Sequence, residues 1–114
     1  MLSTQAPTIV GKLTIPVQNG FEVLDIASIL YCQADDNYTL IYFEDKKKLV
    51  SKTLKYFEDA LGSNGFARVH KSYLININRI VAYKKGKGGS VVLSNGKEIM
   101  VSPSKKKELL AFFS

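Results

Sequence analysis

Residues 66–76 read Phe66-Ala67-Arg68-Val69-His70-Lys71-Ser72-Tyr73-Leu74-Ile75-Asn76, and this stretch decides the fold. Two apolar-rich runs, Phe66 to His70 and Tyr73 to Ile75, flank a polar centre. Short runs of this kind, separated by polar residues, are typical of β-strands. Lys71 and Ser72 would be poor choices for a protein core, so we place them at the rim of a strand pair. We expect Asn76 to be a turn or cap residue.

Turn signals recur along the rest of the chain and separate further runs of Val, Ile, Leu, Tyr and Phe. Asn19-Gly20 and Asn95-Gly96 are the strongest, because both residues of such a turn tolerate positive φ, and each predicts a hairpin. The chain is therefore expected to be mainly β. The further predicted strands are Leu13 to Val17, Phe21 to Leu24, Lys48 to Lys52, Arg79 to Lys84, Ser90 to Leu93 and Glu98 to Val101.

The run Asn37 to Phe43 differs from the other strand-like runs, because apolar or aromatic side chains alternate onto both of its faces. A strand with two apolar faces is covered on both sides. We therefore predict that it is a central strand. Cys32, in another strand-like run, is interpreted as a small buried hydrophobe.

Two stretches have helical signals. Thr53 can cap a short packing helix at about 53–61, with Gly62 as its stop. Ser102 can cap a second helix at about 103–113, with Pro103 at its first position and Leu109, Leu110 and Phe113 on its apolar side. Lys105 to Lys107 lie in or next to its first turn, where positive charge is unfavourable unless an anion is bound.

Charge is the most informative part of the composition. The 114 residues carry a net charge of +6. Residues 1–45 hold one lysine against six carboxylates, a charge of −5, whereas residues 46–114 hold fifteen Lys and Arg against four carboxylates, a charge of +11. Such a basic half attracts nucleic acid, an anionic membrane surface or an acidic protein, and charge alone does not choose among them.

Length and composition indicate one cytoplasmic domain. No apolar run approaches the roughly 20 residues that a membrane helix needs, so we expect no membrane association. A single cysteine and a single histidine cannot build a disulfide scaffold or a structural zinc site. Residues 1–12 are interpreted as a leader or linker, and residues 13–114 as the domain.

Enzymatic motifs are missing, so we predict no enzyme, no metal and no cofactor. His70 could act as a base, but a nucleophile and an orienting group are not evident around it, and a structural or phosphate-binding role is favoured. The run Lys84-Lys85-Gly86-Lys87-Gly88-Gly89 lacks the order of a Walker motif. We interpret it as a flexible hairpin loop that can touch a nucleic-acid backbone.

Three segments together resemble a known family. Asp36-Asn37-Tyr38-Thr39, the run Arg68 to Asn76, and Ile99-Met100-Val101-Ser102 are similar in sequence and order to the LytTR DNA-binding domain of bacterial response regulators. The resemblance implies an elongated arrangement of small antiparallel sheets, with three loops that enter successive grooves of the duplex. It implies DNA base contacts by Asn37, Tyr38, Lys71 and Ser104, and DNA backbone contacts by His70, Ser72, Ser102, Lys105 and Lys106.

The chain departs from the family at two positions where an arginine is common. Lys71 binds guanine less rigidly than an arginine fork, and Pro103 has no side-chain donor, so Ser104 or Lys105 is expected to take over.

The resemblance implies sequence-specific binding of double-stranded DNA in two-component (phosphorelay) transcription regulation. The implied partners are an upstream receiver domain and a second copy on repeated half-sites. A β-rich module that binds RNA or an acidic protein is the alternative, and a small hydrolase using His70 is the third hypothesis.

Overall fold

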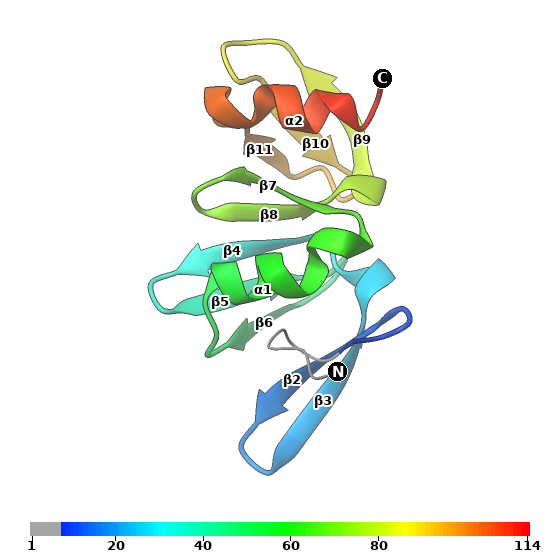
Figure 1. Cartoon of the computed structure of the whole chain (residues 1–114), viewed down its shortest axis with the longest axis vertical. Helices are drawn as coiled ribbons and strands as arrows, with labels where there is room; N and C mark the ends of the chain where they lie inside the picture. Colours follow the sequence, from blue (N-terminus) through cyan, green and yellow to red (C-terminus); the bar gives the residue numbers. More distant parts are fainter. Residues whose placement is uncertain (1–7) are drawn as a thin grey trace.

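The computed structural model describes residues 8–114 and consists of three antiparallel sheets arranged along the long axis of a body of 45 × 33 × 25 Å. Figure 1 shows the sheet of β2 and β3 at one end, the sheet of β9 to β11 at the other, and a five-stranded sheet between them. The prediction of an elongated, mainly β fold with two short helices is confirmed. Within residues 8–114, no helix is both long and apolar enough to cross a bilayer.

The first sheet has the order β1-β2-β3, with β1 at Thr8–Ile9, β2 at Lys12–Val17 and β3 at Gly20–Asp25. Its hairpin turns at the predicted Asn-Gly signal. Leu13 and Ile15 of β2 are buried against the central sheet. Of the expected leader, residues 1–7 lie outside the described residues, and the described ladder begins at Thr8.

The central sheet has the order β6-β5-β4-β8-β7. Its middle strand is β4, and β5, which contains most of the predicted central strand, lies beside it. The prediction that β5 is covered on both faces holds only in part, because Tyr42 stacks on the buried Tyr31 ring but the other end of the same face is open. Thr39 and Ile41 are buried, whereas Tyr38 on the opposite face is 45% exposed. The bounds are β4 Tyr31–Asp35, β5 Tyr38–Tyr42, β6 Lys47–Val50, β7 Phe66–His70 and β8 Tyr73–Asn76.

Alternation along β4 and β8 places a separate core on each face of the central sheet. Cys32 and Leu74 point into a core that also holds α1 and β2, whereas Tyr31 and Ile75 point into a core shared with the third sheet and α2. Burial, followed by the neighbouring phenols of Tyr42 and Tyr73, raises the pKa of Tyr31 to about 12, so that side chain stays neutral.

The helix α1, Leu54–Leu61, begins as predicted, because the Thr53 hydroxyl accepts a hydrogen bond from the Tyr56 amide at 3.2 Å. Gly62 directly follows the last residue of α1 and is its C-cap, so the predicted stop is confirmed, with a right-handed φ of −58°. The chain then continues into a 3₁₀ turn and reverses at Gly65, where φ is +83°. A glycine suits this position because it adopts positive φ without strain.

The third sheet has the order β11-β10-β9, with β9 at Ile80–Lys84, β10 at Ser90–Leu93 and β11 at Glu98–Met100, so the second Asn-Gly hairpin is confirmed. The C-terminal helix is shorter than predicted. The 3₁₀ turn η4, Pro103–Lys105, precedes α2, Lys106–Ala111, and the Ser102 side chain makes no capping bond. Leu109 is buried, but Phe113 lies beyond α2 and is 56% exposed.

Asn76 ties the central sheet to the chain that enters it. Its side-chain amide donates to the Ile29 carbonyl at 2.9 Å, and its side-chain oxygen accepts from the Asn78 amide at 3.0 Å. The side chain is 3% exposed and caps the 3₁₀ turn that follows β8. The predicted cap role of Asn76 is confirmed.

Candidate nucleic-acid interface

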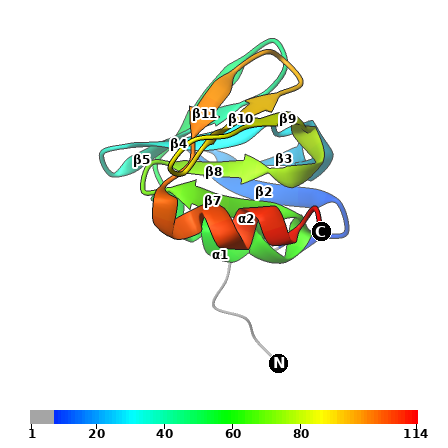
Figure 2. The same ribbon diagram turned by 90° about the horizontal axis from the view of Figure 1, so that it is seen from above.

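Three turns that carry the predicted contact residues lie on one side of the molecule. They are the β4–β5 turn, the β7–β8 turn and the start of η4 before α2. Figures 1 and 2, which share their horizontal axis, both show these three on the left, and Figure 1 shows them one above another along the long axis. A row of surface turns of this kind can meet an extended ligand at several points.

The β4–β5 turn is a two-residue turn, because Asp35 pairs with Tyr38 and only Asp36 and Asn37 lie between them. Asp36 has a φ of 58°, a left-handed conformation that Asp tolerates better than most residues. Asn37 is exposed, and so is nearly half of Tyr38. Asn37 and Tyr38, which are predicted to contact bases, are therefore both at the surface, next to the carboxylates of Asp35 and Asp36.

The β7–β8 turn carries Lys71 and Ser72 between paired His70 and Tyr73. His70 is half-buried, and its Nδ1 accepts a hydrogen bond from the Ser72 amide at 3.1 Å. Since Nδ1 is the acceptor, Nε2 is the ring nitrogen that can carry a proton and donate outward. Lys71 is exposed at the tip of the turn.

A β-bulge precedes this turn. The register shifts between Arg68 and His70, so Val69 is the extra residue of β7. The extra residue of a bulge is left without a partner in the ladder. Here the Val69 carbonyl accepts from the Ser102 amide at 2.8 Å. The bulge thus binds the second turn to the segment that begins the third.

The third turn is built on Ser102. Its carbonyl accepts from the Lys105 amide at 2.8 Å, which closes the 3₁₀ turn and leaves Ser104 exposed. Lys105 pairs loosely with Glu108 at 3.9 Å, and the Lys106 ammonium lies 3.5 Å from the Gly86 carbonyl of the β9–β10 loop. Neither lysine is held by a strong internal partner.

A depression of about 300 Å³ lies between the second and third turns and brings together five of the nine predicted contact residues. Its charged groups are three cations and one carboxylate, so an anion is the ligand that it favours. Asn37, Tyr38, Ser72 and Lys106 do not line it. The lining residues are Glu58, Arg68, His70, Lys71, Ser102, Ser104 and Lys105.

Ser72 has a second role that links the turns. Its carbonyl accepts a hydrogen bond from the Ala34 amide at 2.9 Å. The β7–β8 turn is therefore bonded to β4, the strand that leads into the β4–β5 turn. The relative placement of all three turns is therefore held by backbone hydrogen bonds.

The β9–β10 loop is the hairpin loop that the sequence predicted, and it packs against the third turn. The Gly89 carbonyl accepts from the Val101 amide at 3.0 Å, and the Tyr83 hydroxyl donates to the Gly88 carbonyl at 3.0 Å. A Cβ atom at Gly88 would lie 1.8 Å from the Val101 carbonyl oxygen. Glycine is therefore required here by close approach of two backbones, a constraint that the sequence alone did not show.

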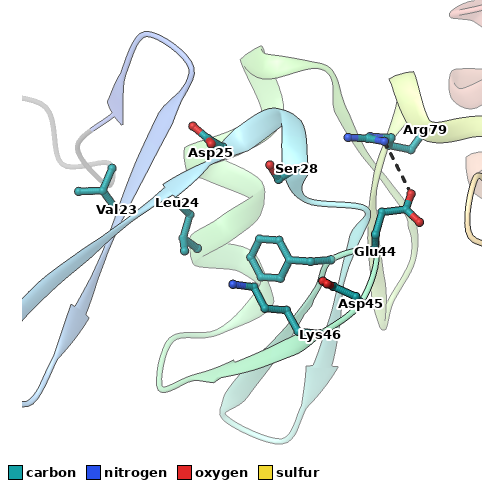
Figure 3. Close-up of a pocket in the computed structure, with 9 residues that line it drawn as sticks. Val23, Leu24, Asp25, Ser28, Glu44, Asp45, Lys46 and Arg79 are labelled. Atoms are coloured by element: carbon teal, nitrogen blue, oxygen red, sulfur yellow. Dashed lines mark ion pairs between the residues drawn. The ribbon is translucent and has the colours of Figure 1, made fainter.

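Another depression, of about 390 Å³, lies at the far end of β5, beside the β5–β6 turn. Figure 3 shows its mixed charges, with Arg79 facing Glu44 at 3.7 Å. None of the predicted contact residues lines it. Cys32 is fully buried and burial raises the pKa of its thiol, as expected for the small hydrophobe that the sequence predicted.

Comparison with known proteins finds relatives of this chain. The family model described as the LytTr DNA-binding domain matches residues 19–114. The Bacillus subtilis sensory transduction protein LytT is 28% identical over 100 residues, and the match covers 86% of this chain and 42% of LytT. The CO-responsive transcriptional regulator RcoM of Rhodospirillum rubrum is 26% identical over 91 residues, covering 79% of this chain and 39% of RcoM.

A solved structure of a LytTr DNA-binding domain from Bacillus cereus has the same fold. It superposes with a TM-score of 0.76 at 23% identity and covers 91% of this chain and 97% of its own. The chain thus spans about two fifths of the length of the curated relatives and nearly all of the solved domain.

We predict that Gly88→Ala destabilises the domain by about 1 to 3 kcal/mol, because the added methyl group must push the β9–β10 loop away from Val101. Gly62→Ala is the matched control, since nothing lies within 4 Å of its Cβ and its φ is −58°. The control should be neutral or slightly stabilising. Denaturant unfolding of the two variants measures both effects, and equal stabilities would contradict the close approach.

Proposed function

Because this chain belongs to the LytTR DNA-binding domain family, we propose that its three turns enter successive major grooves of one duplex and read its sequence. The observation that carries the proposal is their alignment along one side of the molecule. Asn37, Tyr38, Lys71 and Ser104 contact base edges. His70, Ser72, Ser102, Lys105 and Lys106 contact the phosphate backbone.

The charges of the three turns indicate which of them contacts base edges and where a phosphate binds. Asp35 and Asp36 directly precede Asn37, and carboxylates repel phosphates, so the first turn meets base edges rather than the backbone. An exposed carboxylate there can accept a hydrogen bond from the cytosine amino group. The basic depression between the second and third turns takes the intervening phosphate instead. This arrangement explains why the basic half of the chain starts after the first turn.

Hydrogen-bonding capacity supports the individual roles. With its Nδ1 occupied by the Ser72 amide, His70 offers Nε2 to a phosphate oxygen. Lys71 offers a flexible point charge to guanine, which discriminates less sharply than an arginine fork. Pro103 has no side-chain donor, so the exposed hydroxyl of Ser104 is the reader of the third turn.

The wider biological setting is part of the same proposal. Two relatives are named as a sensory transduction protein and a transcriptional regulator, and the match covers about two fifths of each. We infer that the domain is the DNA-binding output of a cytoplasmic bacterial response regulator, with a receiver domain upstream. Two copies bind repeated half-sites.

Selection of bound sequences from random duplex DNA, followed by salt titration, tests the function. With about five phosphate contacts, log affinity should fall against log salt with a slope near −4.5. The selected duplex should bind more tightly than random duplex and than RNA of the same sequence. A nearly flat salt response would favour an acidic protein partner, and tighter binding of RNA would favour the RNA-binding alternative.

Lys71→Ala should weaken binding to the selected duplex by roughly 1 to 3 kcal/mol and relax preference at one base position, with little loss on random DNA. Lys97→Ala is the control, because Lys97 is an exposed lysine in the β10–β11 turn, away from the three turns. Competition binding on both duplexes measures the effect. Equal weakening on selected and random DNA would make Lys71 a phosphate contact.

Replacing Lys105 and Lys106 by Gln should leave the free domain as stable or slightly more stable, because their internal partners are weak and their charges oppose the helix dipole. Binding to all DNA should weaken, and the salt slope should fall by about one unit per lost contact. Lys46 and Lys97 replaced by Gln serve as the control at equal charge. A lower melting temperature with unchanged affinity per folded molecule would make Lys105 and Lys106 structural.

A further inference from the structure

Arg68 uses three different nitrogens for three acceptors within the chain. Its Nε donates to the His70 carbonyl at 2.9 Å, one terminal nitrogen donates to the Lys71 carbonyl, and the other donates to Glu58 Oε1 at 2.9 Å. Two of these acceptors are consecutive carbonyls at the start of the β7–β8 turn. The guanidinium thus holds together the backbone at the start of the β7–β8 turn.

The carboxylate that holds this guanidinium lies on a rigid element. Glu58 is in α1, directly after Phe57, whose side chain is fully buried. The Arg68 side chain is 21% exposed and that of Glu58 is 32% exposed, so water weakens their attraction less than at a fully exposed pair. Helix α1 thereby fixes the position of a turn that it does not itself carry.

The bulge makes this geometry possible. Arg68 pairs with Leu74 and His70 pairs with Tyr73, so Val69 is the additional residue between the two. A bulge bends its strand and redirects the neighbouring side chains. After the bulge, the backbone of the turn comes back over Arg68, and two carbonyls meet one guanidinium.

We propose that Arg68 is the positioning residue of the β7–β8 turn, and that Glu58 on α1 orients it, so that Lys71 is presented to the DNA bases. Arg68 itself makes no base contact. The inference deepens the proposed function and rests on it. It assigns a role in DNA recognition to a helix that lies outside the three turns.

Lysine cannot replace this arginine. A guanidinium presents donors in a planar fork, which lets it hold two carbonyls and a carboxylate at once, whereas an ammonium is a single point. Arg68→Lys therefore keeps the charge and removes the clamp. A phosphate contact would survive this change, at least in part, because lysine also binds phosphate.

The first arm of the test follows the free 114-residue chain by amide hydrogen exchange. Loosening the turn exposes the Ser72 amide, which is bonded to His70 Nδ1, and we expect its exchange to quicken about fivefold or more in Arg68→Lys and in Glu58→Gln. Asp59→Asn is the matched control, because Asp59 is the next carboxylate on α1 and pairs with Lys55 at 3.0 Å instead of with Arg68. Unchanged exchange at Ser72 in both variants would overturn the inference.

The second arm compares affinity for the selected duplex with affinity for random duplex. Arg68→Lys and Glu58→Gln should each lower this specificity ratio by about fivefold or more, and Asp59→Asn should leave it unchanged. When Lys71→Ala is already present, Arg68→Lys should change the ratio by less than about twofold, since both act through one contact. A merely structural role would lower the melting temperature and leave the ratio per folded molecule intact.

The two arms separate the possible failures. Wild-type chain that binds both duplexes equally would refute the proposed function. A wild-type preference that Arg68→Lys leaves unchanged would refute the inference alone. A full additional loss from Arg68→Lys in the Lys71→Ala background would make Arg68 a direct contact and would also overturn it.

Discussion

The hydrogen bond from the Ser102 amide to the Val69 carbonyl is the constraint on which the candidate interface depends. It joins β7 of the central sheet to the segment that leads into α2, which is otherwise distant in the chain. The bulge leaves the Val69 carbonyl free to accept this bond. One extra residue in one strand therefore sets both the shape of the second turn and its distance from the third.

Two further backbone hydrogen bonds connect this pair of turns to the β4–β5 turn on one side and to the β9–β10 loop on the other. The Ala34 amide binds the Ser72 carbonyl and brings the first hairpin into line, and the Val101 amide binds the Gly89 carbonyl and brings the β9–β10 loop against the third turn. These are backbone bonds, so the placement of the three turns relative to one another does not depend on the exposed side chains at their tips. Such a division lets the exposed side chains serve a ligand.

Local signals in the sequence predicted local structure well. The two Asn-Gly hairpins, the Thr53 cap, the Asn76 cap and the polar rim at Lys71 and Ser72 each depend on neighbours within a few residues. The contact residues came from resemblance to a family, and their roles stay predictions. The sequence missed features that arise between distant segments: the bulge, the clamp by Arg68 and Glu58, and the close approach at Gly88. It also gave no signal for the left-handed Gly65 at which the chain reverses after α1, because only the packed chain selects that position.

The two cores on opposite faces of the central sheet have a consequence for how the domain loses its structure. Tyr31 and Cys32 are adjacent in β4, yet they belong to different cores, and the same holds for Leu74 and Ile75 in β8. Neither core can open without disturbing a strand that the other needs. Units that share buried strands melt together rather than in stages, since partial opening exposes apolar surface on both faces. The domain is therefore expected to behave as one cooperative folding unit from β2 to α2, despite its three separate sheets.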